Sequence, residues 1–109
     1  MALEWKTVYA GIHARGEASF PPAGLHYLLQ LSRQTYRQHN RPVTPAELWD
    51  AFRAQTRRDF GSLAPRVLED WGLTRPGEVG KAVMLLERHG CLTLEPGDTP
   101  EAFQALEAS

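Results

Sequence analysis

Apolar positions repeat every three or four residues along most of this chain, the spacing that gathers them on one face of an α-helix. The pattern predicts two helices within the first 40 residues, three between residues 44 and 90, and a short one after Thr99. The first helix has the least regular pattern, because Thr7, Val8 and Tyr9 would suit a strand nearly as well. The expected fold class is therefore mostly α, a helical bundle.

The three central helices have clear boundary residues. The segment Thr44-Pro45-Ala46-Glu47 has the pattern of a capping box, with a hydroxyl cap, a proline at the first helical position and a glutamate that returns to the cap. Ser62 is the expected cap of the second helix, and Thr74 with Pro76 should open the third. Each helix is followed by a glycine that can end it through a positive φ: Gly61, Gly72 and Gly90.

The pattern changes after Gly90, where Cys91-Leu92-Thr93-Leu94-Glu95 alternates like a strand and is cut off by a Pro-Gly turn. The nearest β-compatible partner is Arg41-Pro42-Val43. We expect these segments to pair as a minimal two-stranded wing beside a helix-turn-helix. The prediction is one winged-helix-like domain with these parts: two N-terminal helices (1–40), a three-helix winged core (41–95), and a C-terminal turn and short helix (96–109).

The composition is that of an ordinary globular domain, with 42% hydrophobic and 23% charged residues among 109. A chain of this size can bury a core without a metal or disulfide. The lone cysteine, Cys91, permits no internal disulfide and fits a reducing compartment. No run approaches the roughly 20 apolar residues of a membrane span, and no signal peptide pattern opens the chain. We expect a cytoplasmic protein that makes no membrane contact.

Candidate chemistry is sparse. The four histidines do not fall at the spacing of metal ligands, and His89 and Cys91 are separated by a glycine where the helix ends. Cys91 stands at the start of an expected core strand, without the base that a nucleophilic thiol needs. We therefore expect no catalytic residues, no metal and no cofactor, and do not expect an enzyme.

Charge is distributed unevenly along the chain. Residues 33–66 carry seven arginines against three carboxylates, a net charge of +4, whereas residues 67–109 have a net charge of −5. Arginines repeat at helical spacing in two rows, one at positions 33, 37 and 41 and the other at positions 53 and 57. Their planar guanidinium groups are suited to binding phosphate or carboxylate. The same rows also fit an ordinary solvated helix surface. The candidate anion or nucleic-acid face consists of Arg33, Arg37, Arg41, Arg53 and Arg57.

The third central helix carries Met84 and Leu85 outside its main apolar stripe. They indicate either a central helix packed on two neighbours or an exposed edge that docks a partner. At the start of this helix, Arg75 and Lys81 could contact DNA, but Glu78 would repel phosphate. Backbone N–H groups near Pro76 could instead receive a carboxylate or phosphate.

Several short motifs stand at characteristic distances from one another: Val43-Thr44-Pro45-Ala46-Glu47-Leu48, Phe60-Gly61-Ser62-Leu63-Ala64, Val67-Leu68, Trp71-Gly72-Leu73, Glu78-Val79-Gly80 and Asp98-Thr99-Pro100-Glu101-Ala102-Phe103. In this spacing the chain resembles the Minf family of uncharacterised bacterial proteins, over about residues 20–103. The resemblance implies the same helical outline and no assigned reaction or cofactor. The chain departs from the family pattern at four positions: Arg41, Val79, Lys81 and Ala102. Phe60, Trp71 and Phe103 are interpreted as packing residues.

These patterns favour a binding protein. The first hypothesis is a protein-interaction or adaptor module, because the net charge is only −1 and the third helix has a second apolar side. The alternative is an RNA- or ribosome-associated protein that uses the arginine rows. A DNA-binding regulator is favoured less than either. A protein is the expected partner, with RNA as the alternative, and self-association is also compatible with the sequence.

Overall fold

The computed structural model describes residues 7, 9–11, 20–39, 43–92 and 98–108. This part of the chain is mostly helical, which confirms the helical part of the expected fold class. Within the first predicted helix, Thr7 and residues 9–11 are helical, and its other positions lie outside the described residues. None of the helices described has both the length and the apolar character needed to cross a membrane.

Helix α3 (Pro45–Phe60) begins at the capping box that the sequence predicts. The Thr44 hydroxyl accepts a hydrogen bond from the Glu47 N–H at 3.1 Å, and the Glu47 carboxylate accepts one from the Thr44 N–H at 3.0 Å. Both otherwise unsatisfied donors at the start of the helix therefore have local partners. The α6 helix (Pro100–Ala105) starts similarly, since the Thr99 hydroxyl accepts from the Ala102 N–H at 3.2 Å.

Between α3 and α4 (Ala64–Trp71), residues Gly61–Leu63 form the short 3₁₀ turn η1. The expected cap at Ser62 is wrong, because Leu63 occupies the cap position and makes no side-chain cap bond. Helix α4 ends at Gly72, whose φ of 70° is left-handed, and the Leu73 N–H donates to the Leu68 carbonyl at 3.0 Å. This glycine-based ending satisfies the last carbonyls of α4 and turns the chain toward α5 (Pro76–Arg88).

The described residues contain no strand, so the two-stranded wing is not supported. Cys91 shows the physical reason: its N–H donates to the Leu86 carbonyl at 2.9 Å, which completes the end of α5 after Gly90. Its carbonyl accepts from Arg33 at 3.4 Å. The N–H and the carbonyl of Cys91 are thus already bonded to a helix carbonyl and to an arginine side chain, and not to a neighbouring strand. Residues 41–42 and 93–95, the remainder of the predicted wing apart from Val43 and Leu92, lie outside the described residues.

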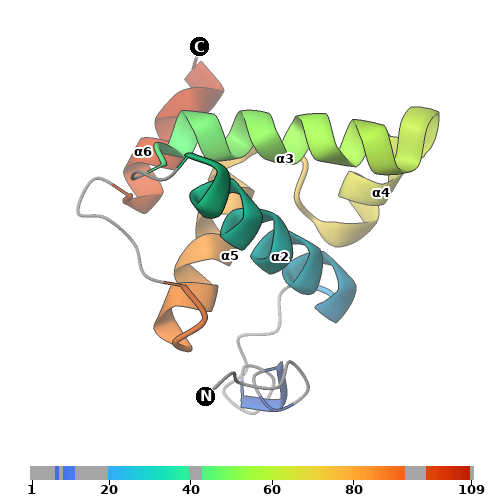
Figure 1. The fold of residues 1–109 in the computed structure, drawn as a ribbon. Coiled ribbons are helices and arrows are strands. Elements are labelled where there is room, and N and C mark those ends of the chain that lie inside the picture. The colour runs from blue at the N-terminus through green and yellow to red at the C-terminus, as the bar shows by residue number, and fades with distance from the viewer. Residues whose placement is uncertain (1–6, 8, 12–19, 40–42, 93–97, 109) are drawn as a thin grey trace.

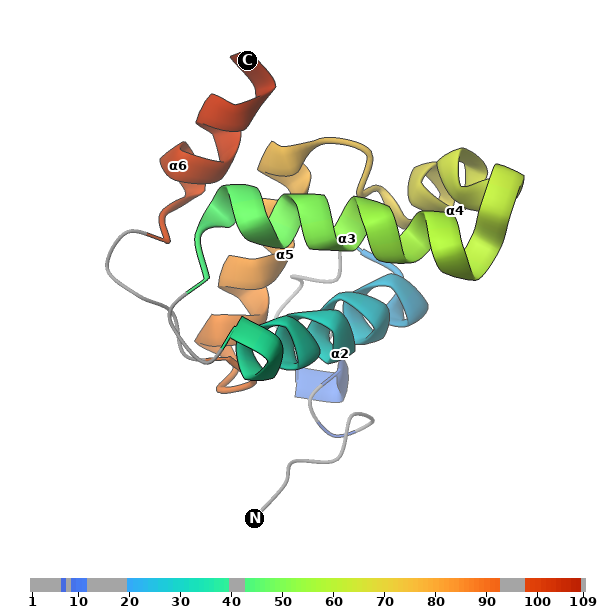
Figure 2. The same ribbon diagram turned by 45° about the horizontal axis from the view of Figure 1, so that its top comes forward.

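Helix α5 packs against α2 (Pro22–His39), α3 and α6. Its apolar stripe, as the sequence predicts, is fully buried: Val79, Ala82, Val83 and Leu86. Figure 1 and Figure 2 show α4 and α6 at opposite ends of α3, with α2 crossing beside it. After α6 the chain continues in a second 3₁₀ turn, η2 (Leu106–Ala108). The two short helices therefore pack at separate sites: α4 against α3, and α6 against α5.

An aromatic group holds α4 against α2 and α3. The Tyr27 ring lies 5.0 Å from the Trp71 ring and 5.7 Å from the Phe60 ring, between centroids. Phe60 and Trp71 meet edge to face at 5.6 Å. Gly24 makes room for this packing, since a Cβ there would lie 2.8 Å from Cγ of Trp71. Phe60 and Trp71 are half-buried and so serve the packing role that the sequence indicates.

Candidate functional site

Helix α5 begins without a local side-chain cap. Arg75 occupies the cap position with an extended backbone, and its side chain makes no cap hydrogen bond. Pro76 has no N–H, and the N–H groups of Glu78 and Val79 both donate to the Arg75 carbonyl. Gly77 is therefore the first-turn position whose N–H needs a partner from elsewhere.

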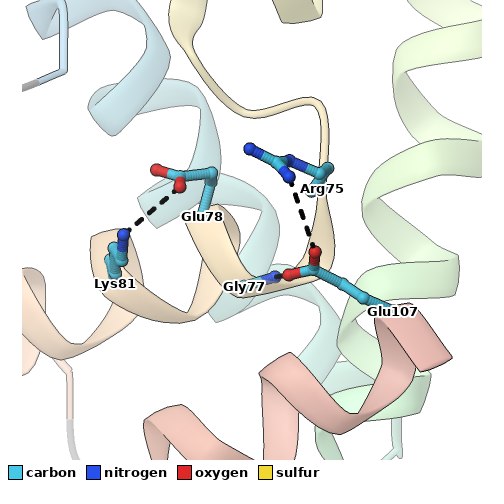
Figure 3. Close-up of polar contacts among 5 residues, drawn as sticks. All are labelled: Arg75, Gly77, Glu78, Lys81 and Glu107. Carbon is cyan, nitrogen blue, oxygen red and sulfur yellow. Dashed lines mark hydrogen bonds and ion pairs between the residues drawn. The ribbon is translucent and has the colours of Figure 1, made fainter.

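That partner is a carboxylate thirty residues along the chain. The Gly77 N–H donates to Oε2 of Glu107 in η2 at 2.9 Å, as Figure 3 shows. The other carboxylate oxygen lies 4.0 Å from Nη1 of Arg75. One turn on, Lys81 lies 3.3 Å from a carboxylate oxygen of Glu78 (Figure 3). The anion that the sequence predicts for this helix start is thus supplied by the chain itself.

Close packing of α6 on α5 brings Glu107 to this position. A Cβ built on Gly80 would lie 2.6 Å from Cβ of Phe103, and one built on Gly77 would collide with the Glu107 carboxylate. Phe103 is only 1% exposed, as its expected packing role requires. The two basic side chains at this helix start, Arg75 and Lys81, remain 69% and 68% exposed beside these contacts.

The surface beside α4 is open instead. A cleft of about 620 Å³ lies between the second half of α3 and the η1–α4 segment. Arg53, Thr56 and Arg57 line its α3 side, and Ala64, Pro65 and Leu68 supply apolar lining from α4. Ser62, Glu69 and Thr74 add polar groups. Its size is that of a pocket for a small ligand or a short peptide segment.

Arg53 and Arg57 are the two predicted anion-face residues that share this cleft. The Arg53 guanidinium lies 5.6 Å from the centroid of the Trp49 ring, a cation–π arrangement that restrains it. Among the described residues, Arg57 has no hydrogen-bond or ion-pair partner for its side chain. Neighbouring Arg58 donates to the Gln55 amide oxygen at 2.9 Å. Arg57 is thus a cation in the last turn of α3 without a described counter-charge.

The other predicted arginines lie elsewhere. Arg33 donates to the Cys91 carbonyl at the end of α5, and Arg37 is exposed in the last turn of α2. Tyr27, near the start of α2, donates to Asp59 at 2.6 Å, which fixes that end of α2 at the end of α3. Arg33 and Arg37 follow Tyr27 by roughly 9 and 15 Å along the helix axis. The two rows therefore do not converge in the cleft, and Arg41 lies outside the described residues.

Met84 and Leu85 line a second recess, of about 460 Å³, along α5. Phe20 and Pro100 add apolar surface there, and charged side chains of α5 complete the lining. Leu85 is only 7% exposed and belongs to the core, whereas Met84 is half-buried. The structure thus places both residues of the predicted docking edge at one recess, with little of Leu85 accessible.

Burial also shifts two titratable groups. Desolvation, together with its bond to Asp59, raises the pKa of the Tyr27 hydroxyl far above its usual value. Desolvation likewise raises the pKa of the Cys91 thiol, although Arg33 opposes the shift. A thiol held in its neutral form is a poor nucleophile. In the described part of the chain, no group of three or more His, Cys, Asp or Glu side chains is arranged to hold a metal ion.

Two features of these surfaces were missed at the level of sequence. Nothing near Glu107 marks it as the partner of Gly77, although the Gly77-x-x-Gly80 spacing is a signal for close helix approach. Leu63, between two cleft-lining residues, is 66% exposed, which no periodicity shows. A scan against protein-family models, a search of curated proteins and a search of solved structures each find no match to this chain. The Minf resemblance stays a prediction based on its motifs.

Proposed function

We propose that this chain is a protein-interaction module that binds its partner at the cleft between α3 and α4. The observation that carries the proposal is the meeting there of an arginine without a described counter-charge and an apolar surface. Arg57 lines the cleft beside Arg53, across from Ala64, Pro65 and Leu68. Interfaces commonly combine an apolar centre with arginine contacts at its margin.

Leu63 does not itself line the cleft, but it lies next to cleft residues in the chain and its side chain is exposed. A large apolar side chain at 66% exposure is unfavourable unless something covers it, and it lies directly between cleft residues Ser62 and Ala64 in the chain. Single exposed apolar residues are common on protein surfaces.

Nucleic acid fits the described surfaces less well. At the start of α5, which reads DNA in helix-turn-helix proteins, the Glu107 carboxylate accepts the Gly77 N–H and lies near Arg75, so a negative charge already occupies this site. Among the described residues, the cleft lining includes no aromatic side chain on which an unpaired base could stack. These observations favour the adaptor hypothesis over the RNA-binding alternative.

The test is recovery of the tagged protein from its native lysate, with and without nuclease, at low and moderate salt. We expect a protein companion that survives both treatments, is lost with Arg57→Glu and is kept with Arg58→Glu. Arg58 is the matched control because it is in the same helical turn and does not line the cleft. Both variants should be shown to melt as cooperatively as the parent protein.

Three other outcomes would contradict the proposal. Companions that disappear with nuclease and with a modest rise in salt would support the RNA-binding alternative, because phosphate contacts weaken steeply with salt. Equal loss with Arg57→Glu and Arg58→Glu would indicate a general charge effect. Loss of the companion with Met84→Ser alone would indicate that the partner binds at the recess on α5.

A further inference from the structure

We propose that the α3–α4 cleft binds an extended acidic segment of the partner, with carboxylates at alternate positions and an apolar side chain between them. This inference rests on the proposed function and specifies the partner's chemistry. The two walls of the cleft differ: α3 contributes Arg53 and Arg57, and α4 contributes mainly apolar residues together with Glu69. A ligand that satisfies both walls must present opposite chemistry on its two sides.

The spacing of the arginines sets the spacing of the carboxylates. Arg53 and Arg57 are one helical turn apart, which separates their backbone positions by about 6 Å along α3. In an extended peptide, side chains two residues apart lie on the same side and are separated by about 6.6 Å. An acidic residue, any residue and a second acidic residue therefore match the spacing of the two arginine positions along α3. Each arginine can hold one carboxylate in a charge-assisted hydrogen bond.

The same geometry selects an apolar residue at the middle position. Alternate side chains of an extended segment point in opposite directions, so the middle residue faces α4 when its neighbours face α3. Its surroundings there are Ala64, Pro65 and Leu68. Glu69 lies on the same helix and would repel a third carboxylate on that side. The pattern that fits is acidic, apolar, acidic.

The cleft, of about 620 Å³, has the size of a small-ligand pocket, so a short segment is enough to occupy it.

The experiment measures binding of fluorescent peptides to the full chain by anisotropy. The probes are short peptides with the cores Glu-Leu-Glu, Lys-Leu-Lys and Glu-Ser-Glu in one neutral flanking sequence. We expect Glu-Leu-Glu to bind most tightly, with the other two weaker by about tenfold or more. Arg57→Gln should weaken Glu-Leu-Glu binding by about tenfold, and Arg58→Gln by less than about twofold. Thermal melting of both variants checks that they fold.

Each contrary result overturns the inference in a recognisable way. Equal binding of Glu-Ser-Glu would remove the apolar part, and equal binding of Lys-Leu-Lys the acidic part. Displacement of the probe by single-stranded RNA but not by unlabelled Glu-Leu-Glu would assign the cleft to nucleic acid. Loss of the lysate companion with Arg57→Glu, without any binding of Glu-Leu-Glu, would reject this peptide chemistry and leave the proposed function standing. Peptide binding without an Arg57-dependent companion would reject the proposed function.

Discussion

The start of α5 and the cleft beside α4 both present groups that attract an anion, yet only the first holds one from this chain. At α5, the Glu107 carboxylate accepts the Gly77 N–H and lies near Arg75. At the cleft, the Arg57 side chain has no hydrogen-bond or ion-pair partner among the described residues, although Glu69 also lines the cleft. The first surface is completed by folding, whereas the second stays available to another molecule.

The packing around the two surfaces explains the difference. Two glycines of α5 let α6 approach closely enough for Phe103 to enter the core and for Glu107 to reach the helix start. Around the cleft, the contacts of Tyr27, Phe60 and Trp71 hold α4 against α2 and α3 but do not fill the space that Arg57 and Leu68 line. The contact of Gly80 with Phe103 therefore closes the α6 end of α3, whereas the α4 end keeps an open cleft.

The largest expected effect comes from Phe103→Ala, which removes the side chain that fixes α6 to α5. Loss of this buried ring should lower the free energy of unfolding by about 3–5 kcal/mol. Urea or thermal unfolding measures the change, with the exposed Leu63→Ala expected to stay within about 0.5 kcal/mol. A Phe103→Ala protein as stable as its parent would show that α6 does not close α5.

A pair of glycine substitutions tests the close approach itself. Alanine in a helix is about 1 kcal/mol more favourable than glycine. At Gly80 the new Cβ meets Phe103 at 2.6 Å, and overpacking of about 1–3 kcal/mol should make the net change destabilising. At Gly77 the neighbour is the end of the flexible Glu107 side chain, which can move away, so the net change should be small. Denaturant unfolding measures the change in the free energy of unfolding for both variants. A Gly80→Ala protein more stable than its parent would contradict the tight contact with Phe103.

Thr44→Ala tests a helix start whose cap is local. Loss of the hydroxyl leaves the Glu47 N–H without its partner and should cost about 1 kcal/mol. The measurement is thermal unfolding, where Thr44→Ser should retain most of the parent's stability because it keeps the hydroxyl. Equal losses in both variants would point to the methyl group and away from the cap.

Glu107→Gln tests the distant cap of α5, and its effect should be smaller. A glutamine oxygen can still accept from the Gly77 N–H, so the variant loses mainly the charge that favours a helix N-terminus. We expect a loss below about 1 kcal/mol that shrinks as salt is added. A loss that is independent of salt would assign the role of Glu107 to packing.

The smallest expected effect on stability belongs to Arg57→Gln. Because this side chain has no partner among the described residues, its loss should change the free energy of unfolding by less than about 0.5 kcal/mol. Chemical denaturation provides the measurement, alongside Arg58→Gln as the matched control. A large loss would mean that Arg57 stabilises α3, which would remove the basis for assigning it to a partner.

Local signals in the sequence specify most of the helices. The α3 capping box, the Thr99 cap, the glycine ends and the buried stripe of α5 all follow from residues within a turn or two of one another. Such features depend on backbone donors and side chains that meet without help from the rest of the fold. The predicted wing is not supported, and contacts outside its own segment explain why. The Cys91 N–H donates to a carbonyl of α5, and the Cys91 carbonyl accepts from Arg33.

The sequence by itself therefore determined that this protein is helical, where several of its helices start and stop, and which face of α5 is buried. Only the tertiary structure decided that Glu107 caps α5 and that Arg53 and Arg57, but not Arg33, line the α3–α4 cleft. Helix periodicity fixes the face on which a residue lies. Which other face it meets depends on how the helices cross, and that is set by contacts between residues far apart in the chain.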